Sequence, residues 1–267
     1  GNQFVENMSY AIYKIDPNHS PLGNPSEIDQ IWNLPHYKKN LPFMKAYFKT
    51  DKAICVPYIW DSIFIDFQIQ NSNFKDKEIN FSSINCKSLL VMEPNLFFAK
   101  NCILPLYIIE RFEQKYPKVL NSSHLLCAKK IAENDYFIKL IMQLDIFKRQ
   151  NFLKIENRTL FIDAINRFGS ILVSHQQDNA LNYIYLEAFY LNIPLLHNSD
   201  IISDFGYFYP ENDIDIAVTR LNEIINQHSD SEEDYKKNCN YILNKYSSKN
   251  DKNKNEYKKI LMQVLES

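Results

Sequence analysis

Short apolar runs alternate with helix-length amphipathic segments through most of this chain, and this alternation constrains the fold more than any other feature. Strands are predicted at 88 to 95 (SLLVMEPN), 124 to 130 (HLLCAKK), 158 to 163 (RTLFID), 170 to 175 (SILVSH) and 193 to 199 (IPLLHNS). Helices are predicted at 99 to 115, 133 to 148, 179 to 191, 213 to 228, 232 to 247 and 253 to 266. Such alternation predicts crossover connections, and we therefore expect an α/β fold: a Rossmann-like parallel sheet with helices on both faces and a C-terminal helical cap.

The chain before this region follows a less regular pattern. Residues 27 to 50 predict a helical segment broken by prolines, and 52 to 61 (KAICVPYIWD) predict a buried strand. The polar span from 71 to 87 predicts a linker. We therefore expect one domain at 1 to 70 and a second domain at 88 to 267.

Composition narrows the classes of partner and cofactor. The 30 basic and 32 acidic side chains nearly cancel, which argues against nucleic acid or an anionic membrane as the partner. The five cysteines form no CxxC pair, and no run of about 18 apolar residues predicts a transmembrane segment, so we expect a cytoplasmic protein. The four glycines, at positions 1, 23, 169 and 206, are too scarce and too far apart to form a GxGxxG or Walker A loop. Any bound phosphate must then be held by helix N-termini and side chains.

The stretch from 170 to 200 carries the strongest indication of a site. A predicted strand ends in the polar loop QQDN, where Asp178 or Asn179 is placed to cap the next helix. The free amides at that helix start would form an anion site at the carboxyl ends of the strands. The alternative is a well-capped helix without a ligand.

Glu187 stands among apolar neighbours in the same predicted helix. A carboxylate in such surroundings needs a partner, and the hydroxyls of a ribose would supply one. The alternative is that Glu187 faces solvent.

A DxD sequence, Asp213-Ile214-Asp215, occurs before the predicted helix at 213 to 228. In metal-dependent glycosyltransferases such a pair of carboxylates holds a divalent cation. Because Asp213 directly precedes an amphipathic run, we interpret it as a helix cap and predict no metal site.

The segment LEAFYLNIPLLHNS resembles the helix-turn-strand of GT-B glycosyltransferases, in which a helical glutamate binds the ribose of the nucleotide sugar. Glu187 matches that glutamate. The family has a second glutamate eight positions earlier, where this chain has Asn179, so a retaining mechanism does not carry over. The glycine that usually precedes the proline is also missing before Pro194.

A closer resemblance covers nearly the whole chain. The segments WNLPHY, VPYIWD, MEPN, VSHQ, NALNYIYLEAFY, IPLLHNS and GYFYP are similar to a bacterial family of unassigned function that is grouped with the GT-B superfamily. The resemblance implies a nucleotide-sugar site in the C-terminal half. It also implies that residues 1 to 70 are the remainder of a second α/β domain on the acceptor side, beginning after that domain's first strands.

On this resemblance, the donor site draws on residues that follow three strands and begin one helix. The expected donor-binding residues are Glu93, Asn95, Lys100, His175, Asn179, Asn182, Tyr183, Glu187, His197, Asn198 and Ser199. Each histidine has a structural alternative, since a lone histidine at a strand end is commonly a satisfied core group. Lys100 has the alternative of an ordinary solvated lysine.

The function implied is transfer of a sugar from a nucleotide-diphosphate donor to a glycan or other hydroxyl acceptor. No metal or other cofactor is expected, because Lys100 and helix amides would neutralise the departing diphosphate. An inverting route needs a general base, for which His36 and Asp61 are the candidates. Two alternatives remain open: a catalytically inactive nucleotide-sugar or glycan-binding module, and a protein-interaction domain.

Overall fold

The computed structural model describes residues 28–71, 87–96, 99–169 and 171–266. Contacts divide the chain into two compact units: unit 1 comprises residues 1–60 and 244–267, and unit 2 comprises residues 61–243. This division differs from the predicted domains, because the C-terminal helix groups with the N-terminal segment. The predicted linker at 71 to 87 lies almost wholly outside the described residues.

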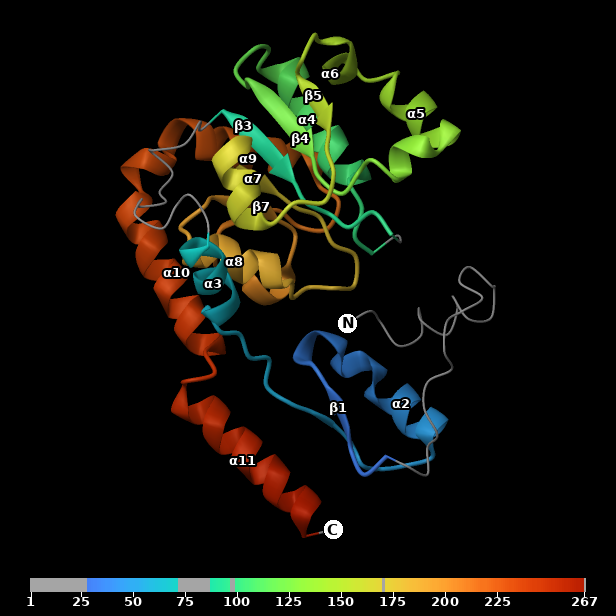
Figure 1. The fold of residues 1–267 in the computed structure, drawn as a ribbon, viewed down its shortest axis with the longest axis vertical. Coiled ribbons are helices and arrows are strands. Elements are labelled where there is room, and N and C mark those ends of the chain that lie inside the picture. The colour runs from blue at the N-terminus through green and yellow to red at the C-terminus, as the bar shows by residue number, and fades with distance from the viewer. Residues whose placement is uncertain (1–27, 72–86, 97–98, 170, 267) are drawn as a thin grey trace. The chain divides into compact units, whose positions relative to one another are not determined.

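Unit 2 is built on a six-stranded parallel sheet (Figure 1). The strands are β3 (Ser88–Val91), β4 (Ser122–Leu125), β5 (Leu153–Ile155), β6 (Ile171–Val173), β7 (Leu195–His197) and β8 (Tyr207–Phe208). They lie in the order β5-β4-β3-β6-β7-β8, and every neighbouring pair is parallel. In chain order this is the 3-2-1-4-5-6 arrangement of a Rossmann fold, whose order reverses between β3 and β6. The predicted α/β fold with a parallel sheet is confirmed.

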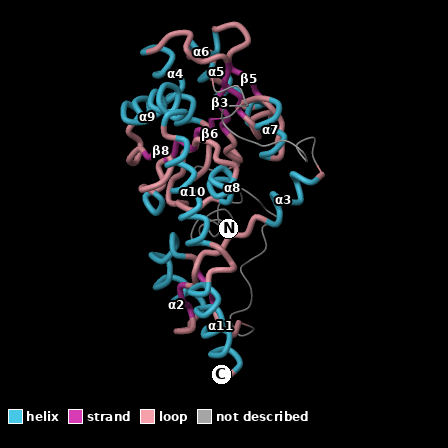
Figure 2. The backbone as a smooth tube through the Cα atoms, turned by 90° about the vertical axis from the view of Figure 1, so that its left-hand side faces the viewer, coloured by secondary structure: helices cyan, strands magenta, loops and turns pink. Residues whose placement is uncertain are grey.

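Helices lie on both faces of this sheet. The described helices of unit 2 are α3 (Ile63–Gln70), α4 (Ile103–Lys115), α5 (Asp135–Ile141), α6 (Asp145–Lys148), α7 (Phe161–Arg167), α8 (Tyr183–Tyr190), α9 (Ile214–Gln227) and α10 (Glu232–Tyr246), of which α10 crosses the unit boundary. Helices α4 and α9 pack together on one face, and α7 lies on the other (Figure 2). Leu89 and Val91 join the core under α4 and α9, whereas the intervening Leu90 points to the opposite face. Burial on both faces explains why the strands are continuous apolar runs.

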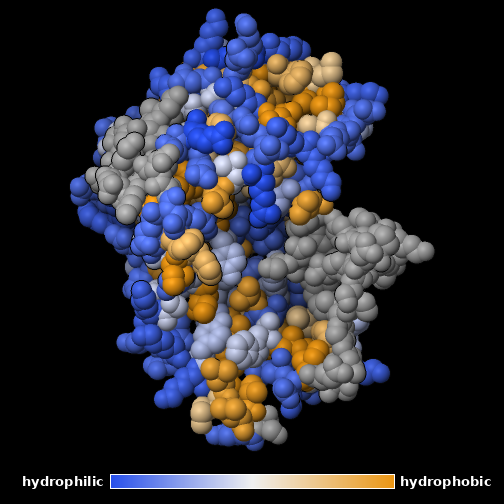
Figure 3. Space-filling view, in the orientation of Figure 1, coloured by the Kyte–Doolittle hydropathy of each residue, from blue (hydrophilic) through white to orange (hydrophobic). Residues whose placement is uncertain are grey.

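Helix α3 departs from this pattern of buried apolar faces. Ile65 is buried, but Ile63, Phe64 and Phe67 are 62%, 77% and 67% exposed. These side chains form part of the apolar surface over α3 in Figure 3. The helix is tied to α8 by a hydrogen bond of 2.6 Å from the Tyr190 hydroxyl to the Asp66 carboxylate.

Unit 1 contains a two-stranded parallel sheet of β1 (Ile31–Asn33) and β2 (Ala53–Cys55), joined through the 3-10 helix η2 (Pro35–Asn40) and α2 (Leu41–Phe48). Helix α11 (Asp251–Leu265) belongs to this unit. Its Tyr257 hydroxyl donates a hydrogen bond of 2.7 Å to the backbone oxygen of Pro57. This contact over 200 positions explains why the predicted C-terminal cap groups with the N-terminal segment.

Three element predictions were wrong in detail. The predicted strand at 158 to 163 is a loop and the first turn of α7, and the strand β5 lies at Leu153–Ile155. Phe161 and Ile162 are buried because they face the core from a helix, and a short apolar run does not distinguish the two structures. Within the predicted helical segment at 27 to 50, Ile31–Asn33 instead pairs with β2. The predicted helix at 133 to 148 is interrupted between α5 and α6.

No helix within the described ranges is both long and apolar enough to cross a membrane.

Candidate functional site

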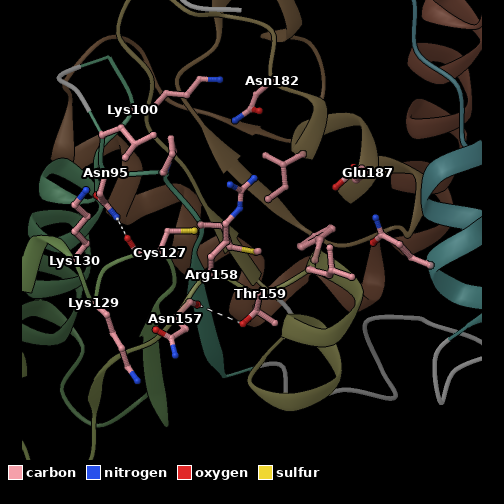
Figure 4. Close-up of a pocket in the computed structure, with 17 residues that line it drawn as sticks. Asn95, Lys100, Cys127, Lys129, Lys130, Asn157, Arg158, Thr159, Asn182 and Glu187 are labelled. Carbon is pink, nitrogen blue, oxygen red and sulfur yellow. Dashed lines mark hydrogen bonds between the residues drawn. The ribbon is translucent and has the colours of Figure 1, made fainter. Parts of the chain in front are cut away.

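A pocket of about 520 Å³ opens at the carboxyl ends of β3, β4 and β5, beside the start of α8 (Figure 4). Its lining comes from unit 2: Gln68, Met92, Pro94 to Leu96, Lys100, Cys127, Lys129, Lys130, Asn157 to Phe161, Asn182, Ile184 and Glu187. The volume falls within the range of small-molecule sites. The pocket borders the point where the strand order reverses, which is where open α/β sheets bind ligands.

Four cations line the pocket: Lys100, Lys129, Lys130 and Arg158. Within the described part of the chain, none of the four forms an ion pair with a carboxylate. Elsewhere on the surface such pairs are common, as between Arg220 and Glu223 at 2.7 Å. With Glu187 as the acidic side chain of the lining, the four cations give the pocket a net positive charge, which suits an anionic ligand.

Glu187 faces the same pocket from α8. Its side chain is half-buried, and burial raises the pKa of its carboxyl. Among the described residues it has no hydrogen-bond or ion-pair partner. A carboxylate in this state has free acceptor capacity, and the two hydroxyls of a ribose would satisfy it.

Asn95 lines the pocket, but its amide also fixes the loop after β3. Its Nδ2 donates to the backbone oxygen of Glu93 at 2.9 Å and of Cys127 at 3.4 Å, and its Oδ1 accepts from the Cys102 amide at 2.8 Å. These bonds join the loops after β3 and β4 and hold the start of α4. Asn95 has a positive φ of 55°, which asparagine tolerates better than most residues.

Helix α8 begins later than predicted. Its N-cap is Asn182, whose side chain makes no capping bond, so neither Asp178 nor Asn179 caps the helix. Asp178 has a positive φ of 54°, and the Asn179 amide donates to the side chain of Gln176 at 2.5 Å, so this stretch remains a turn. Asn182 lines the pocket, whereas the buried Asn179 and the exposed Tyr183 do not.

Glu93 lies in the interior at the end of β3 and is 2% exposed. Its Oε1 accepts hydrogen bonds from the Ser174 hydroxyl and, at 3.3 Å, from the His175 amide. Its Oε2 has no hydrogen-bond partner among the residues that the structure describes. Burial raises the pKa of Glu93 to about 7, although these bonds and the charge of Lys100 oppose the shift. Glu93 does not line the pocket, and its contacts are with the protein.

His175 is also turned inward. The Tyr209 hydroxyl donates to the backbone oxygen of Ser174 at 3.0 Å, so the Nδ1–H of His175 is assigned as the donor to Tyr209, at 3.1 Å. Burial lowers the pKa of His175 to about 4, which keeps the ring neutral at pH 7. His175 does not line the pocket.

His197 and Ser199 are fully buried after β7. The Nε2–H of His197 donates to the backbone oxygen of Phe205 at 2.7 Å, and Nδ1 accepts from the Ser199 amide at 3.1 Å. The Ser199 hydroxyl donates to the backbone oxygen of Ala180. Both side chains are thus engaged within the protein, and neither lines the pocket.

Asn198 connects the ends of β6 and β7. Its Oδ1 accepts from the Gln176 amide at 2.9 Å, and its Nδ2 donates to the backbone oxygens of Gln176 at 2.8 Å and Glu211 at 3.2 Å. Asn198 is thus one of the anchors of the loop that leads to α8, together with the Ser199 hydroxyl bound to Ala180. Asn198 therefore supports the site from outside the pocket.

The two predicted bases lie in different units. His36 is in η2 of unit 1, with its ring centroid 4.0 Å from that of Tyr37. Asp61 begins unit 2, and its carboxylate accepts from the Ile63 amide at 3.1 Å, ahead of α3. Neither lines the pocket.

Asp213 is the N-cap of α9, and its side chain accepts from the Ile216 amide at 2.9 Å. Asp215 pairs with Arg111 at 3.2 Å. The capping role predicted for Asp213 is confirmed. No group of three or more metal-ligating side chains occurs within the described ranges.

Four polar residues of the pocket were not predicted from the sequence: Lys129, Lys130, Asn157 and Arg158. The misplaced strand at 158 to 163 assigned Arg158 to a sheet, although it follows β5 in a loop. A strand assigned to 153 to 155 would have put Arg158 at a carboxyl end, beside the residues already selected.

Solved structures resemble this fold. TarM of S. aureus, in complex with Fondaparinux, alpha-GlcNAc-glycerol and UDP, has a TM-score of 0.61 and 15% identity, over 91% of this chain and 45% of TarM. The pneumococcal O-GlcNAc transferase GtfA, in complex with UDP and GlcNAc, has a TM-score of 0.54 and 11% identity, over 97% of this chain and 48% of GtfA. A UDP-forming trehalose-phosphate synthase from Burkholderia xenovorans has a TM-score of 0.58 and 10% identity, over 80% of this chain and 53% of the synthase.

The fold is that of the GT-B glycosyltransferases. At these identities the likeness concerns the fold alone, and the chain spans about half the length of these enzymes. The chain belongs to the family described as "Protein of unknown function (DUF2827)", whose sequence model matches residues 1–261. No curated protein matches the chain in sequence.

Proposed function

We propose that the pocket of unit 2 binds a nucleotide-diphosphate sugar and that the protein transfers this sugar to a hydroxyl acceptor such as a glycan. One observation carries the proposal: the Glu187 carboxylate shares a pocket with four cations, and among the described residues none of these five side chains forms an ion pair. A nucleotide-diphosphate sugar combines an anionic diphosphate with a ribose diol, and therefore matches both features. The GT-B fold supports the same class of ligand.

In the proposed complex, the diphosphate lies near Lys100 and Asn182, and the ribose hydroxyls donate to Glu187. Binding then fixes the donor so that its anomeric carbon is presented to the acceptor, which replaces a bimolecular encounter with an oriented reaction. The cations would stabilise the charge that develops on the departing diphosphate.

Comparing UDP with 2′-deoxy-UDP by calorimetry tests the role of Glu187. Hydrogen bonds to a charged group contribute about 1.5–3 kcal/mol, so the deoxy compound should bind about 10- to 100-fold more weakly to the unmodified protein. In Glu187→Gln the ratio of the UDP affinity to the 2′-deoxy-UDP affinity should shrink, because the 2′-hydroxyl then faces a neutral amide instead of a carboxylate. Glu256→Gln, an exposed glutamate of α11, is the matched control.

A panel of uridine, guanosine and cytidine diphosphate sugars then identifies the base. If no member of the panel binds the full chain, the proposed function is wrong. An unchanged ratio between UDP and 2′-deoxy-UDP in Glu187→Gln would exclude the ribose contact while leaving donor binding intact.

A nucleotide-sugar-binding module without catalysis is the second candidate. It is favoured by Asn179, which replaces the second glutamate of the GT-B motif and lies buried, outside the pocket lining. Incubation of a bound nucleotide sugar with glycan acceptors separates the two functions. Release of the nucleoside diphosphate together with a glycosylated product supports the transferase, and tight binding without release supports the module.

A further inference from the structure

The loop after β5 is fastened to the loop after β4 at the edge of the pocket. The Glu156 amide donates to the backbone oxygen of Leu125 at 2.8 Å, and the Ala128 amide donates to the backbone oxygen of Glu156 at 3.2 Å. Directly after these bonds, the Thr159 hydroxyl donates to the backbone oxygen of Asn157 at 3.4 Å. Arg158 therefore follows directly after a residue that is fastened to the neighbouring loop, and a local bond closes the turn around it.

The charge of Arg158 is directed into the pocket. In Figure 4 its side chain lies beside Cys127 and extends toward Asn182. Burial raises the pKa of the Cys127 thiol, and the Arg158 guanidinium opposes that shift, so its field reaches the pocket wall. Arg158 has no carboxylate partner among the residues that the structure describes.

Lys100 alone is a weak match for a diphosphate. Burial lowers the pKa of its ammonium, and the nearby Glu93 carboxylate engages part of its charge. The diphosphate of a nucleotide sugar carries one negative charge on each phosphate. A second cation with a fixed charge is needed to neutralise both.

We propose that Arg158 is a phosphate-binding residue that holds the donor diphosphate together with Lys100. This inference rests on the proposed nucleotide-sugar site and adds a ligand from the β5 loop to it. A guanidinium keeps its charge at all relevant pH values and offers two parallel N–H donors, which suits two phosphate oxygens. The side chains of Lys100 and Arg158 both extend toward Asn182, where the diphosphate would lie (Figure 4).

The experiment measures the affinities of UDP and uridine for the full chain and for three variants. Arg158→Gln should weaken UDP binding by about 10- to 100-fold and leave uridine binding unchanged, because uridine has no phosphate. Arg158→Lys keeps the charge without the paired donors and should give a smaller loss. Lys154→Gln, which removes an exposed cation of β5 outside the pocket, should leave both affinities unchanged.

Three results would overturn the inference. Equal UDP affinity in Arg158→Gln and the unmodified protein rejects Arg158 as a phosphate ligand while the donor site stands. An equal loss of UDP and uridine affinity assigns Arg158 to the nucleoside instead. If the unmodified protein binds no nucleoside diphosphate, the proposed function fails together with this inference. Thermal unfolding of each variant verifies folding, which the exposed position of Arg158 should preserve.

Discussion

The hydroxyl of Ser174 donates a hydrogen bond to the carboxylate of Glu93 and thereby joins the ends of β6 and β3. The Tyr185 hydroxyl lies 2.9 Å from the same Ser174 oxygen, which extends the network to α8. A buried carboxyl thus links the two strands between which the strand order of the sheet reverses. This arrangement makes the stability of unit 2 dependent on pH.

Glu93→Gln should remove one component of that dependence. The pKa of Glu93 is raised from 4.5 to about 7 in the folded chain, so the folded state holds this proton more tightly than the unfolded state. The contribution of Glu93 to the free energy of unfolding therefore falls as pH rises through this interval. Above the folded pKa the carboxylate is ionised, and its burial destabilises the folded state in full. The free energy of unfolding of Glu93→Gln, relative to that of the unmodified protein, should therefore increase by on the order of 3 kcal/mol from about pH 4 to about pH 8. Urea unfolding of both proteins at the two pH values measures the gain, and an equal difference at both would contradict it.

Asn198→Ala should destabilise unit 2 by about 1–3 kcal/mol. The substitution removes the two hydrogen bonds that the Asn198 side chain makes with the buried backbone N–H and C=O of Gln176. It should also weaken UDP binding, because the loop before α8 loses one of its anchors. Urea unfolding and calorimetry measure the two effects. Asn255→Ala, at an exposed position of α11, is the control expected to change neither.

Asp213→Ala should cost about 1 kcal/mol through the lost cap of α9, and Asp213→Asn should retain most of the stability. Neither variant should alter UDP affinity if Asp213 serves only as a cap. A large loss of UDP binding in Asp213→Asn would restore the interpretation of the DxD sequence as a metal site.

Chelation of divalent cations should leave donor binding unchanged, because the proposed site relies on side-chain cations. The measurement compares the UDP affinity with EDTA and with excess Mg²⁺. A loss of affinity of tenfold or more on chelation would show that a metal participates in binding.

The apolar periodicity of the chain predicted the class of fold, because strands buried on both faces must be continuous apolar runs. The predicted strands at 88 to 95, 170 to 175 and 193 to 199 contain β3, β6 and β7. The strand at 158 to 163 was misplaced, since its apolar residues face the core from α7. Local pattern alone does not separate a short buried strand from one buried turn of helix.

Within the site, the polarity of residues after the strands located the correct edge of the sheet but not the direction of each side chain. Glu187, Asn95, Lys100 and Asn182 line the pocket. Glu93, His175, His197, Asn198 and Ser199 instead point into the protein, where each forms hydrogen bonds. A polar residue at a strand end looks the same in sequence whether it binds a ligand or a backbone group.

By itself, the sequence determined that a parallel α/β sheet would form and that polar residues would lie at one edge of it. Both follow from the apolar runs and from the alternation of strands with helices, which can be read from each segment of the chain separately. Only the tertiary structure decided which of those residues face the pocket. It also brought Arg158, Lys129 and Lys130 to the site, because the order β5-β4-β3-β6 places loops beside one another that are distant in the chain. Strand order depends on packing of the whole sheet, and no single segment of the sequence encodes it.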